Sequence, residues 1–336
     1  MKLSDFYYDL PKELIAQEPA EKRDSSRLLL VDREKHVITD HVFGDVPRFL
    51  KKGDCLVLND TRVIPARFFG KRKTGADIEI FLINILGDKI SALVKKSSRI
   101  WDGEVLELES GYHVKILGKA DPGRFVEFDA PLEEILKTGH VPLPPYIERA
   151  DRPKDAERYQ TVYSRNEGAT ASPTAGLHFT PELLNKIVGE GVRIVYVTLH
   201  TSYGTFSPVK SENVEEHKMH YENFHLSDSA ASAINDVKYS GGRVIAVGTT
   251  SLRVLETSAD DTGRVKSGEG RTNLFVYPGF RFKIVDALIT NFHLPGSTLL
   301  MLVSAFAGRE FILEAYKQAI DRRYRFFSYG DAMMIV

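Results

Sequence analysis

Residues 66–128 constrain the fold more strongly than any other part of this 336-residue chain. They contain six short runs rich in β-branched and aromatic residues: ARFFGK, DIEIFLIN, ISALVK, EVLELES, YHVKIL and RFVEF. Glycine-containing turns separate the runs, and none of them has the 3.6-residue period of a helix. Six successive short strands predict a small antiparallel β-barrel.

Outside this stretch, apolar strand-like runs alternate with helical patterns. We expect strands over 28–31, 55–58, 192–199, 243–247, 274–277 and 284–289, and helices over 181–188, 228–239, 251–257 and 298–307, with a further helix near the C-terminal end. Such alternation is typical of an α/β domain. The predicted fold is therefore an α/β (α+β) main domain, residues 1–62 and 146–336, interrupted by an inserted small antiparallel β-barrel, residues 63–145.

Composition narrows the class of protein. The chain is 43% hydrophobic and 27% charged, with a formal net charge of −1, so it has no general electrostatic attraction to nucleic acid. Its single cysteine, Cys55, lies in an apolar run, and no Cys/His cluster has zinc spacing. Asp5 and Asp9 stand where a signal peptide would be apolar, and residues 298–307 are too few to span a bilayer. These features favour a cytoplasmic protein without a metal or a membrane partner.

Four polar, glycine-containing segments stand out: residues 171–180, 199–206, 248–253 and 290–297. The first precedes a helix with a complete start signal, in which Thr180 is the N-cap and Pro181 the first helical residue. The other three follow predicted strands. Ligand sites in α/β folds gather at the carboxyl ends of strands, so we expect all four segments to border one cleft.

The segment 243–253 has the pattern strand, tight turn, helix. Free amides at the helix start, together with Gly248, Thr249, Thr250 and Arg253, would form a cradle for a carboxylate or a phosphate. The alternative is a capped helix with a solvated Arg253. The segment is neither a Walker A loop nor a dinucleotide-binding glycine motif, so it does not specifically indicate a nucleotide polyphosphate.

Three histidines, His178, His200 and His293, lie in the expected cleft segments. They are candidates for acid/base chemistry or for hydrogen bonding to a polar base, against the alternative of structural core histidines. The pair His217 and His220 lacks the HExxH pattern and a third ligand, so no metal site is predicted.

Polar residues also mark the barrel and its entrance. Asp60 and Arg62 lie where the barrel begins, either as a hinge or as a ledge facing the cleft. Lys95, Lys96 and Arg99 form a compact cluster of residue types that contact phosphate, although such charges on a barrel are usually only solvated. Ser172 and Ser251 lack the Gly-x-Ser-x-Gly context of a hydrolase nucleophile, which leaves a serine hydrolase as a weak alternative.

Long motifs extend over nearly the whole chain in this order: LPKELIAQEP, NDTRVIPAR, GHVPLPPYI, YQTVYS, SPTAGLHFT, GTFSPV, EEHKMHYE, RVIAVGTTSLR, VYPGF, VDALITNFHLPGSTLLMLVSAFAG and YRFFSYGDAM. Together they resemble the S-adenosylmethionine:tRNA ribosyltransferase-isomerases of queuosine biosynthesis (the QueA family). One departure is Ser202, where the family pattern has glycine.

The resemblance implies a transferase that moves the ribosyl part of S-adenosylmethionine onto an aminomethyl-deazaguanine (preQ1) at the wobble position of tRNA. The sugar is isomerised to an epoxycyclopentane, and adenine and methionine are released. S-adenosylmethionine is then a co-substrate, with no prosthetic group and no metal. The competing classes are a noncatalytic RNA-binding barrel protein and the serine hydrolase.

Within that pattern each candidate residue takes an expected role. The acid/base candidates are His178, His200, His293 and Asp60. The residues expected to bind S-adenosylmethionine are Thr174, Gly176, Gly248, Thr249, Thr250 and Arg253. The residues expected to contact RNA are Lys95, Lys96, Arg99 and Arg62.

Overall fold

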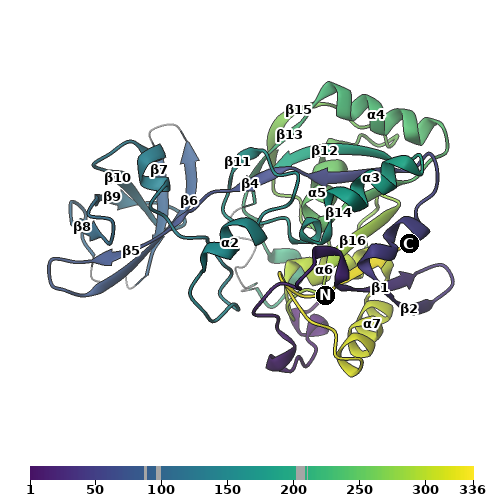
Figure 1. Ribbon diagram of the computed structural model, residues 1–336, viewed down its shortest axis with the longest axis horizontal. Helices are drawn as coiled ribbons and strands as arrows, with labels where there is room; N and C mark the ends of the chain where they lie inside the picture. The colour runs from purple at the N-terminus through teal and green to yellow at the C-terminus, as the bar shows by residue number, and fades with distance from the viewer. Residues whose placement is uncertain (87–88, 96–99, 202–208, 210) are drawn as a thin grey trace.

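The computed structural model describes residues 1–336 except 87–88, 96–99, 202–208 and 210. Figure 1 shows two bodies, a barrel on one side and a larger sheet-and-helix body on the other, joined by the chain segments around β4 and α2. The larger body holds both ends of the described chain.

A nine-stranded sheet is the centre of the larger body, with the order β15-β13-β12-β3-β14-β16-β17-β1-β2. Its strands are β1 (Arg27–Asp32), β2 (Val37–Val42), β3 (Cys55–Asn59), β12 (Arg193–Leu199), β13 (Glu222–Leu226), β14 (Val244–Val247), β15 (Gly268–Thr272), β16 (Ala287–Asn291) and β17 (Ala332–Ile335). Neighbours among β12, β3, β14 and β16 pair in parallel, so these four strands end at the same edge of the sheet. The remaining pairings include antiparallel ones, such as β16 with β17 and β1 with β2.

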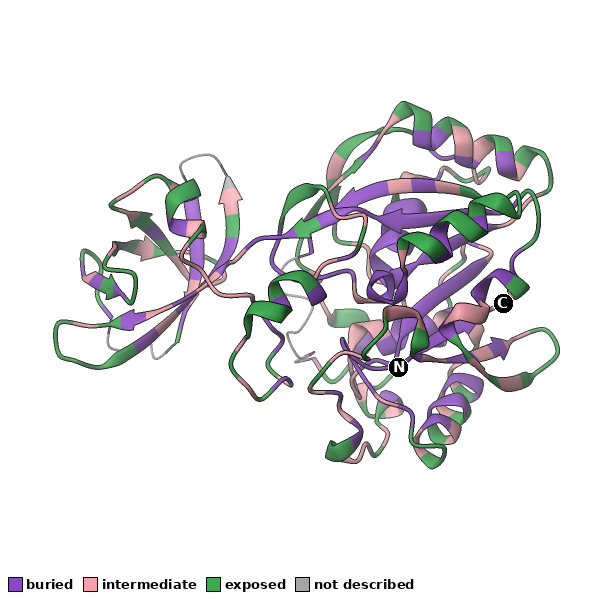
Figure 2. Cartoon of the chain, viewed as in Figure 1, coloured by how far each residue is buried: buried purple, intermediate pink, exposed green. Residues whose placement is uncertain are grey.

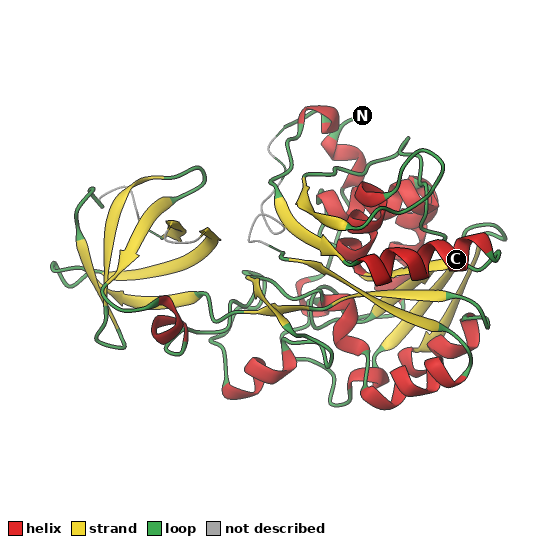
Figure 3. Cartoon of the chain, turned by 90° about the horizontal axis from the view of Figure 1, so that it is seen from above, coloured by secondary structure: helices red, strands yellow, loops and turns green. Residues whose placement is uncertain are grey.

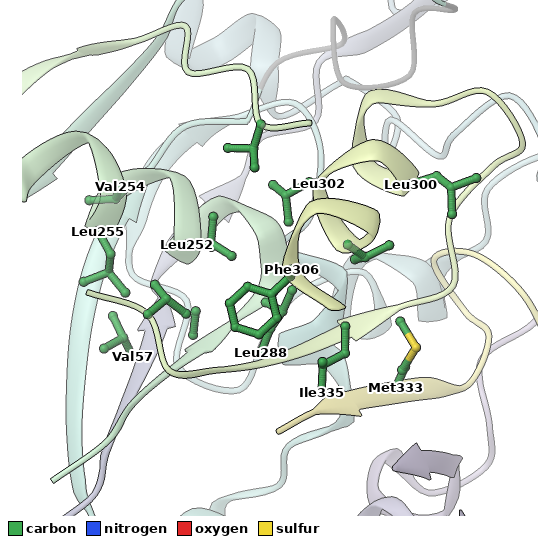
Figure 4. Packing of buried hydrophobic residues seen from close by; sticks show 14 of the residues in the cluster. Val57, Leu252, Val254, Leu255, Leu288, Leu300, Leu302, Phe306, Met333 and Ile335 are labelled. Atoms are coloured by element: carbon green, nitrogen blue, oxygen red, sulfur yellow. The ribbon is translucent and has the colours of Figure 1, made fainter. Parts of the chain in front are cut away.

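Alternate residues of each central strand face opposite layers, because side chains in a strand have a period of two. Val57 and Leu288 pack with the helices α4 (Asp228–Tyr239), α5 (Gly248–Ser258), α6 (Thr298–Ala307) and α7 (Arg309–Asp321), as Figure 4 shows in part. Leu56 and Leu58 pack on the other face with α3 (Pro181–Gly189) and the segment around Phe43. Figure 3 shows helices on both sides of the yellow sheet, and Figure 2 shows its strands as the buried centre of this body.

The second body is a closed barrel with the strand order β10-β7-β6-β5-β8-β9. Its strands are β5 (Arg67–Lys71), β6 (Asp77–Leu86), β7 (Lys89–Val94), β8 (Val105–Leu108), β9 (His113–Lys119) and β10 (Arg124–Phe128), followed by α1 (Leu132–Leu136). At Gly70 the strands approach closely, since a Cβ atom there would lie 2.1 Å from the Glu107 carbonyl oxygen. A parallel pair, β4 (Thr61–Val63) with β11 (Asn166–Ala169), and helix α2 (Pro153–Arg158) lie between the two bodies.

The six barrel strands and the α/β body confirm the predicted fold class. The helix starts are also confirmed, since Leu183 N donates to Thr180 Oγ1 and Ala230 N donates to Ser227 Oγ. Buried Cys55 packs in the core as expected, and burial raises the pKa of its thiol to about 12. Helix α5 begins three residues before the predicted 251, at Gly248.

The strand predicted over 274–277 is wrong. That segment is irregular, and Arg253 Nε donates to the Leu274 carbonyl oxygen there at 3.1 Å. The strand in this region is instead β15, whose sequence GEGRT has no apolar alternation and escaped prediction. The short strands β2, β13 and β17 were missed as well. Within the described residues, no helix is both long and apolar enough to cross a membrane.

Candidate functional site

Residues from all four predicted cleft segments line one cavity at the edge where β12, β14 and β16 end. The lining residues are Tyr146, Ala171, Ser172, Pro173, Thr174, Ala175, Thr201, Gly248, Thr249, Thr250, Thr290, Asn291, Phe292, His293, Leu294, Ser297, Leu299, Phe327 and Ser328. We call this the strand-end cavity. The parallel pairing of the strands explains why segments far apart in the sequence meet here.

The N-terminus of α5 forms one wall of the strand-end cavity. Gly248 makes the turn from β14 into the helix with a φ of 85°, a backbone conformation that other residues rarely adopt. The N-cap residue, Val247, offers no side-chain acceptor to the first helical amides. Free amides at the positive end of a helix favour an anion, so this wall suits a carboxylate.

Several polar atoms of the cavity residues are buried without a hydrogen-bond partner among the described residues. They are Ser172 Oγ, Thr201 Oγ1, Thr250 Oγ1 and Asn291 Oδ1. A buried polar group left unpaired costs about 1–3 kcal/mol, so native proteins rarely gather several of them without a purpose. A polar ligand with donors and acceptors would satisfy these atoms.

His293 lies in the wall of the strand-end cavity and is held firmly. Its Nε2 lies 2.9 Å from Thr290 Oγ1, its backbone N donates to the Tyr316 hydroxyl at 2.9 Å, and the Tyr8 hydroxyl donates to its carbonyl oxygen. Burial lowers the pKa of its imidazole to about 3. At neutral pH this imidazole is therefore uncharged and can donate or accept a proton within a hydrogen bond.

His178 contacts Asn291, which lines the strand-end cavity, and itself lines a separate small cavity with Ser26 and Arg23. Its Nδ1 is 2.7 Å from Ser26 Oγ, its Nε2 is 3.2 Å from Asn291 Nδ2, and its ring stacks on Phe43. Burial, together with the charges of Arg325 and Arg23, lowers its pKa to about 3. Both ring nitrogens thus have partners within the protein, and the histidine reaches the strand-end cavity through Asn291.

His200 and Asp60 lie away from the other two histidines. His200 Nδ1 is 2.8 Å from Thr61 Oγ1, and burial lowers its pKa although Asp60 acts in the opposite direction. His200 lines a second cavity of about 350 Å³, together with Thr201, Glu222, Tyr221, Gly168 and the barrel residues Ile64, Ile83, Asn84, Ile85, Leu132 and Leu136. We call it the interbody cavity. Because Thr201 lines both cavities, the two lie next to each other.

Asp60 is a buried carboxylate at the end of β3. It accepts hydrogen bonds from Arg165 Nε at 2.7 Å, Asn166 Nδ2 at 3.0 Å and Thr198 Oγ1 at 2.7 Å. These three hydrogen bonds join β3, β11 and β12 where the chain enters the barrel. Asp60 is not among the described residues that line either cavity.

The predicted S-adenosylmethionine residues divide into two groups. Thr174, Gly248, Thr249 and Thr250 line the strand-end cavity. Gly176 instead faces the protein, where a Cβ atom would lie 2.1 Å from the Tyr163 hydroxyl. Arg253 is buried one turn along α5, forms an ion pair with Glu222, and is not among the described lining residues.

The predicted RNA residues are described only in part. Lys95 is exposed and its Nζ lies 2.6 Å from Glu79 Oε2, and exposed Arg62 lies 3.6 Å from Glu167. Lys96 and Arg99 lie outside the described residues, as does Ser202. In the part of the chain that the structure describes, no three His, Cys, Asp or Glu side chains are placed to hold a metal ion.

Sequence reasoning singled out the segments but missed some residues that build the site. Ser26 and Asn291 hold His178, and Glu222 holds Arg253. Asn291 carried a signal, since it is a polar residue ending the apolar run ALIT. Ser26 and Glu222 carried no such signal, because their partners are distant along the chain. Ser26 is 152 residues from His178, and Glu222 is 31 residues from Arg253.

Comparisons with known proteins agree over the whole length. The sequence model of the family described as "Queuosine biosynthesis protein" matches residues 3–335. A protein of Acetivibrio thermocellus named S-adenosylmethionine:tRNA ribosyltransferase-isomerase is 55% identical, and one of Syntrophomonas wolfei with the same name is 50% identical. Both alignments cover 100% of this chain. They cover 100% of the Acetivibrio thermocellus protein and 97% of the Syntrophomonas wolfei protein.

A solved structure is similar as well. The crystal structure of S-adenosylmethionine tRNA ribosyltransferase from Thermotoga maritima is 37% identical in sequence, with a TM-score of 0.57. The match covers 99% of this chain and 100% of that one. On the family match and on these full-length identities, the chain belongs to the queuosine biosynthesis protein family.

Proposed function

We propose that this protein is an S-adenosylmethionine:tRNA ribosyltransferase-isomerase that acts in the cytoplasm on tRNA carrying preQ1 at the wobble position. Its products would be epoxyqueuosine-tRNA, adenine and methionine. The observation that carries the proposal is the strand-end cavity, whose helix N-terminus and unpartnered polar atoms suit a zwitterionic, hydroxyl-rich ligand, in a chain that matches this family over its whole length.

The chemistry sets the requirements for such a site. The sulfonium of S-adenosylmethionine acidifies the neighbouring 5′ carbon, so that a base can remove a proton and leave a stabilised ylide. Loss of adenine requires a proton donor near the purine, and methionine leaves when the sulfur–carbon bond breaks. Neutral, buried imidazoles are suited to moving these protons without bringing a competing charge into the site.

The candidate residues fit this scheme in the following way. The amides of Gly248, Thr249 and Thr250 would hold the methionine carboxylate, and Thr174 lines the same cavity. His293 would act at the strand-end cavity, and His200 would act from the interbody cavity, next to Thr201. Asp60, Arg253 and Gly176 would act indirectly, by fixing the strands and the helix that carry these groups.

The barrel completes the proposal. The interbody cavity combines apolar barrel side chains such as Ile83 and Leu136 with the polar groups of His200 and Glu222. A planar base turned out of the anticodon loop would find both an apolar surface and polar partners there. Exposed Lys95 and Arg62, with Lys96 and Arg99, would contact the phosphates. We propose residues 63–145 as the inserted domain and residues 1–62 and 146–336 as the main domain.

The two alternative functions, a noncatalytic RNA-binding protein and a serine hydrolase, explain fewer features of the strand-end cavity. A protein that only binds RNA has no need for the unpartnered atoms of the strand-end cavity. A serine hydrolase needs a serine activated by a base, and neither Ser172 Oγ nor Ser251 Oγ has a hydrogen-bond partner among the described residues.

Adenine release is the direct test. Purified protein incubated with preQ1-containing tRNA and S-adenosylmethionine, without added metal, should release adenine and methionine in equal amounts. The matched control is the same tRNA carrying guanine at the wobble position, which should give no release. Equal release from both tRNAs, or labelling of the protein by a fluorophosphonate, would contradict the proposal.

A further inference from the structure

The side-chain amide of Asn291 has a fixed orientation. Its Nδ2 donates to the Phe327 carbonyl oxygen at 3.2 Å and lies 3.5 Å from the Asp331 carbonyl oxygen, and it also lies 3.2 Å from His178 Nε2. Carbonyl oxygens only accept hydrogen bonds, so the nitrogen of the amide must be on this side. His178 Nε2 then accepts, and its Nδ1 carries the proton that it donates to Ser26 Oγ.

The other amide atom is left without a partner. Asn291 is 3% exposed, its Oδ1 is buried, and this oxygen has no hydrogen-bond partner among the described residues. Asn291 lines the strand-end cavity, as does Phe327, whose carbonyl oxygen accepts from Nδ2, whereas His178 and Asp331 on the same side of the amide are not among the described lining residues. Oδ1 is therefore a fixed hydrogen-bond acceptor for a donor on a bound molecule.

The place of Asn291 in the sheet suggests which donor it meets. Strand β16 pairs in parallel with β14, and Ile289 is opposite Val247, the residue before Gly248. Adjacent strands are about 4.8 Å apart, so Asn291 lies beside the point where β14 turns into α5. The anion-binding amides of α5 and the acceptor on Asn291 thus border the cavity from neighbouring strands.

An α-amino acid carries its carboxylate and its ammonium group on the same carbon atom. The amide donors at the start of α5 and the acceptor Asn291 Oδ1 on the neighbouring strand match this pair of groups. The described lining residues include no Asp, Glu, Lys or Arg, so both charges would be met by neutral dipoles. A fully ionised phosphate has no hydrogen to donate to this acceptor, whereas the ammonium group of an α-amino acid has three.

We propose that Asn291 Oδ1 accepts a hydrogen bond from the α-ammonium group of the methionyl part of S-adenosylmethionine, and that His178 is a positioning residue that holds the Asn291 amide for this contact. The inference rests on the proposed function for its choice of ligand. It adds a residue that determines which end of the ligand lies against β16, and it gives His178 a role at a distance from the reacting atoms.

Two ligands that differ only in the amino group test the proposal. S-adenosylhomocysteine has the α-ammonium group, and its deaminated counterpart, in which a butanoate replaces the amino acid, keeps the thioether and the carboxylate. Isothermal titration calorimetry at pH 7.5 should show that the wild-type protein binds the first at least about tenfold more tightly. This comparison needs no variant.

The variant Asn291→Ala should remove the difference. It should bind both ligands with similar affinity, because the acceptor that distinguishes them is gone. The matched control is Asn59→Ala at the end of β3, since Asn59 is also a buried strand-end amide but has its oxygen and nitrogen paired with Thr61 N, Leu199 N and the Leu199 carbonyl oxygen. The control should lower the melting temperature and keep the tenfold preference.

His178→Ala tests the positioning role. His178→Ala removes one of the acceptors of Asn291 Nδ2 and leaves the Phe327 carbonyl oxygen, so the amide is held less firmly and the preference for the amino ligand should fall to a value between those of wild type and Asn291→Ala. A purely structural histidine would change the melting temperature and leave the preference intact, as Asn59→Ala does.

The possible results distinguish a failure of the proposed Asn291 contact from a failure of the proposed function. A wild-type protein that binds both ligands equally, or an Asn291→Ala variant that loses the same factor for both, would overturn the inference and leave the proposed function in place, because the oxygen would then face the adenine or the ribose. A wild-type protein that binds neither ligand in the presence or absence of tRNA would overturn both.

Discussion

The barrel and the strand-end cavity differ in whether their polar side chains have partners within the described protein. In the barrel, cations are paired with carboxylates of the same small body: Arg72 with Glu104 at 2.7 Å, Arg67 with Glu79 at 3.0 Å and Arg124 with Asp102 at 2.7 Å. At the strand-end cavity, buried hydroxyl and amide oxygens have no described partner. These ion pairs hold segments of the barrel together, whereas we propose that the unpaired atoms of the cavity find their partners on a bound molecule.

The stability of the barrel can be measured separately from that of the larger body, because the barrel contains the single tryptophan of the chain. The chain has a single tryptophan, Trp101, and it lies in the barrel beside the Arg72 guanidinium, which is 5.3 Å from the ring centroid. Its fluorescence therefore follows the barrel, while circular dichroism in the far ultraviolet follows the helices of the larger body. Perturbations of one body should separate the two signals.

The largest effect is expected from Glu104→Gln. The Glu104 side chain is 4% exposed and accepts from Arg72 Nε and from the Trp101 backbone amide, so its loss leaves a poorly solvated guanidinium without its carboxylate. Removing one partner of such a pair costs about 3–5 kcal/mol. The free energy of unfolding of the barrel, measured by urea titration with Trp101 fluorescence, should fall by that amount. The affinity for S-adenosylmethionine should stay at the wild-type value. A large loss of affinity would show that the two bodies are not separable.

Acid should act on the larger body. Burial holds the pKa of His178 and of His293 at about 3, against 6.5 in an unfolded chain. Between these values the unfolded state binds more protons, so the stability contributed by the neutral imidazoles is complete above pH 6.5 and is lost as the pH falls toward 3. From pH 7.5 to 5.5 the free energy of unfolding should fall by about 1.4 kcal/mol for each histidine.

This pH effect is measured by urea titrations read by circular dichroism and by Trp101 in parallel. The circular dichroism midpoint should fall with pH, and the Trp101 midpoint should change less. The double variant His178→Asn, His293→Asn should lose the dependence. A wild-type protein whose stability is constant over this range would mean that these histidines are not neutral and buried.

The smallest effect contrasts two threonines of α5. Thr250 Oγ1 is buried without a hydrogen-bond partner in the described part of the chain, whereas Thr257 Oγ1 lies 2.7 Å from Thr272 Oγ1. Thr250→Val should weaken S-adenosylmethionine binding by about 1 kcal/mol, roughly fivefold, without loss of stability. Thr257→Val should lower stability by a similar amount and leave binding unchanged. If both variants change only stability, the Thr250 hydroxyl does not contact the ligand.

The fold was predictable where local pattern decides it. Each barrel strand has its own apolar alternation and glycine turns, and α3 and α4 have complete start signals, so these elements were identified to within a few residues. Strand β15 could not be found, because its pairing with β13 at the edge of the sheet is made by the backbone of the sequence GEGRT. Its side chains carry no pattern.

The candidate site was predictable at the level of segments. Polar residues that end apolar strands indicated the cavity correctly, since parallel strands bring their ends together. Whether a residue faces the cavity or stands behind it depends on contacts between distant segments. Arg253 is directed to Glu222 and His178 to Ser26, and neither pairing leaves a trace in the local sequence.

The position of β17 has a consequence for how the protein is made. This strand lies between β16 and β1, and Leu28 pairs with Ala332. Among the described strands, the β1–β2 hairpin joins the sheet through β17 alone, and the ribosome synthesises β17 last. During synthesis the barrel can close as soon as β10 has emerged, but β1 has to wait with an open edge. Contacts between segments so distant form slowly, and an exposed edge invites wrong pairing. The β1–β2 hairpin therefore has an unpaired edge along β1 until the last strand of the sheet has been synthesised.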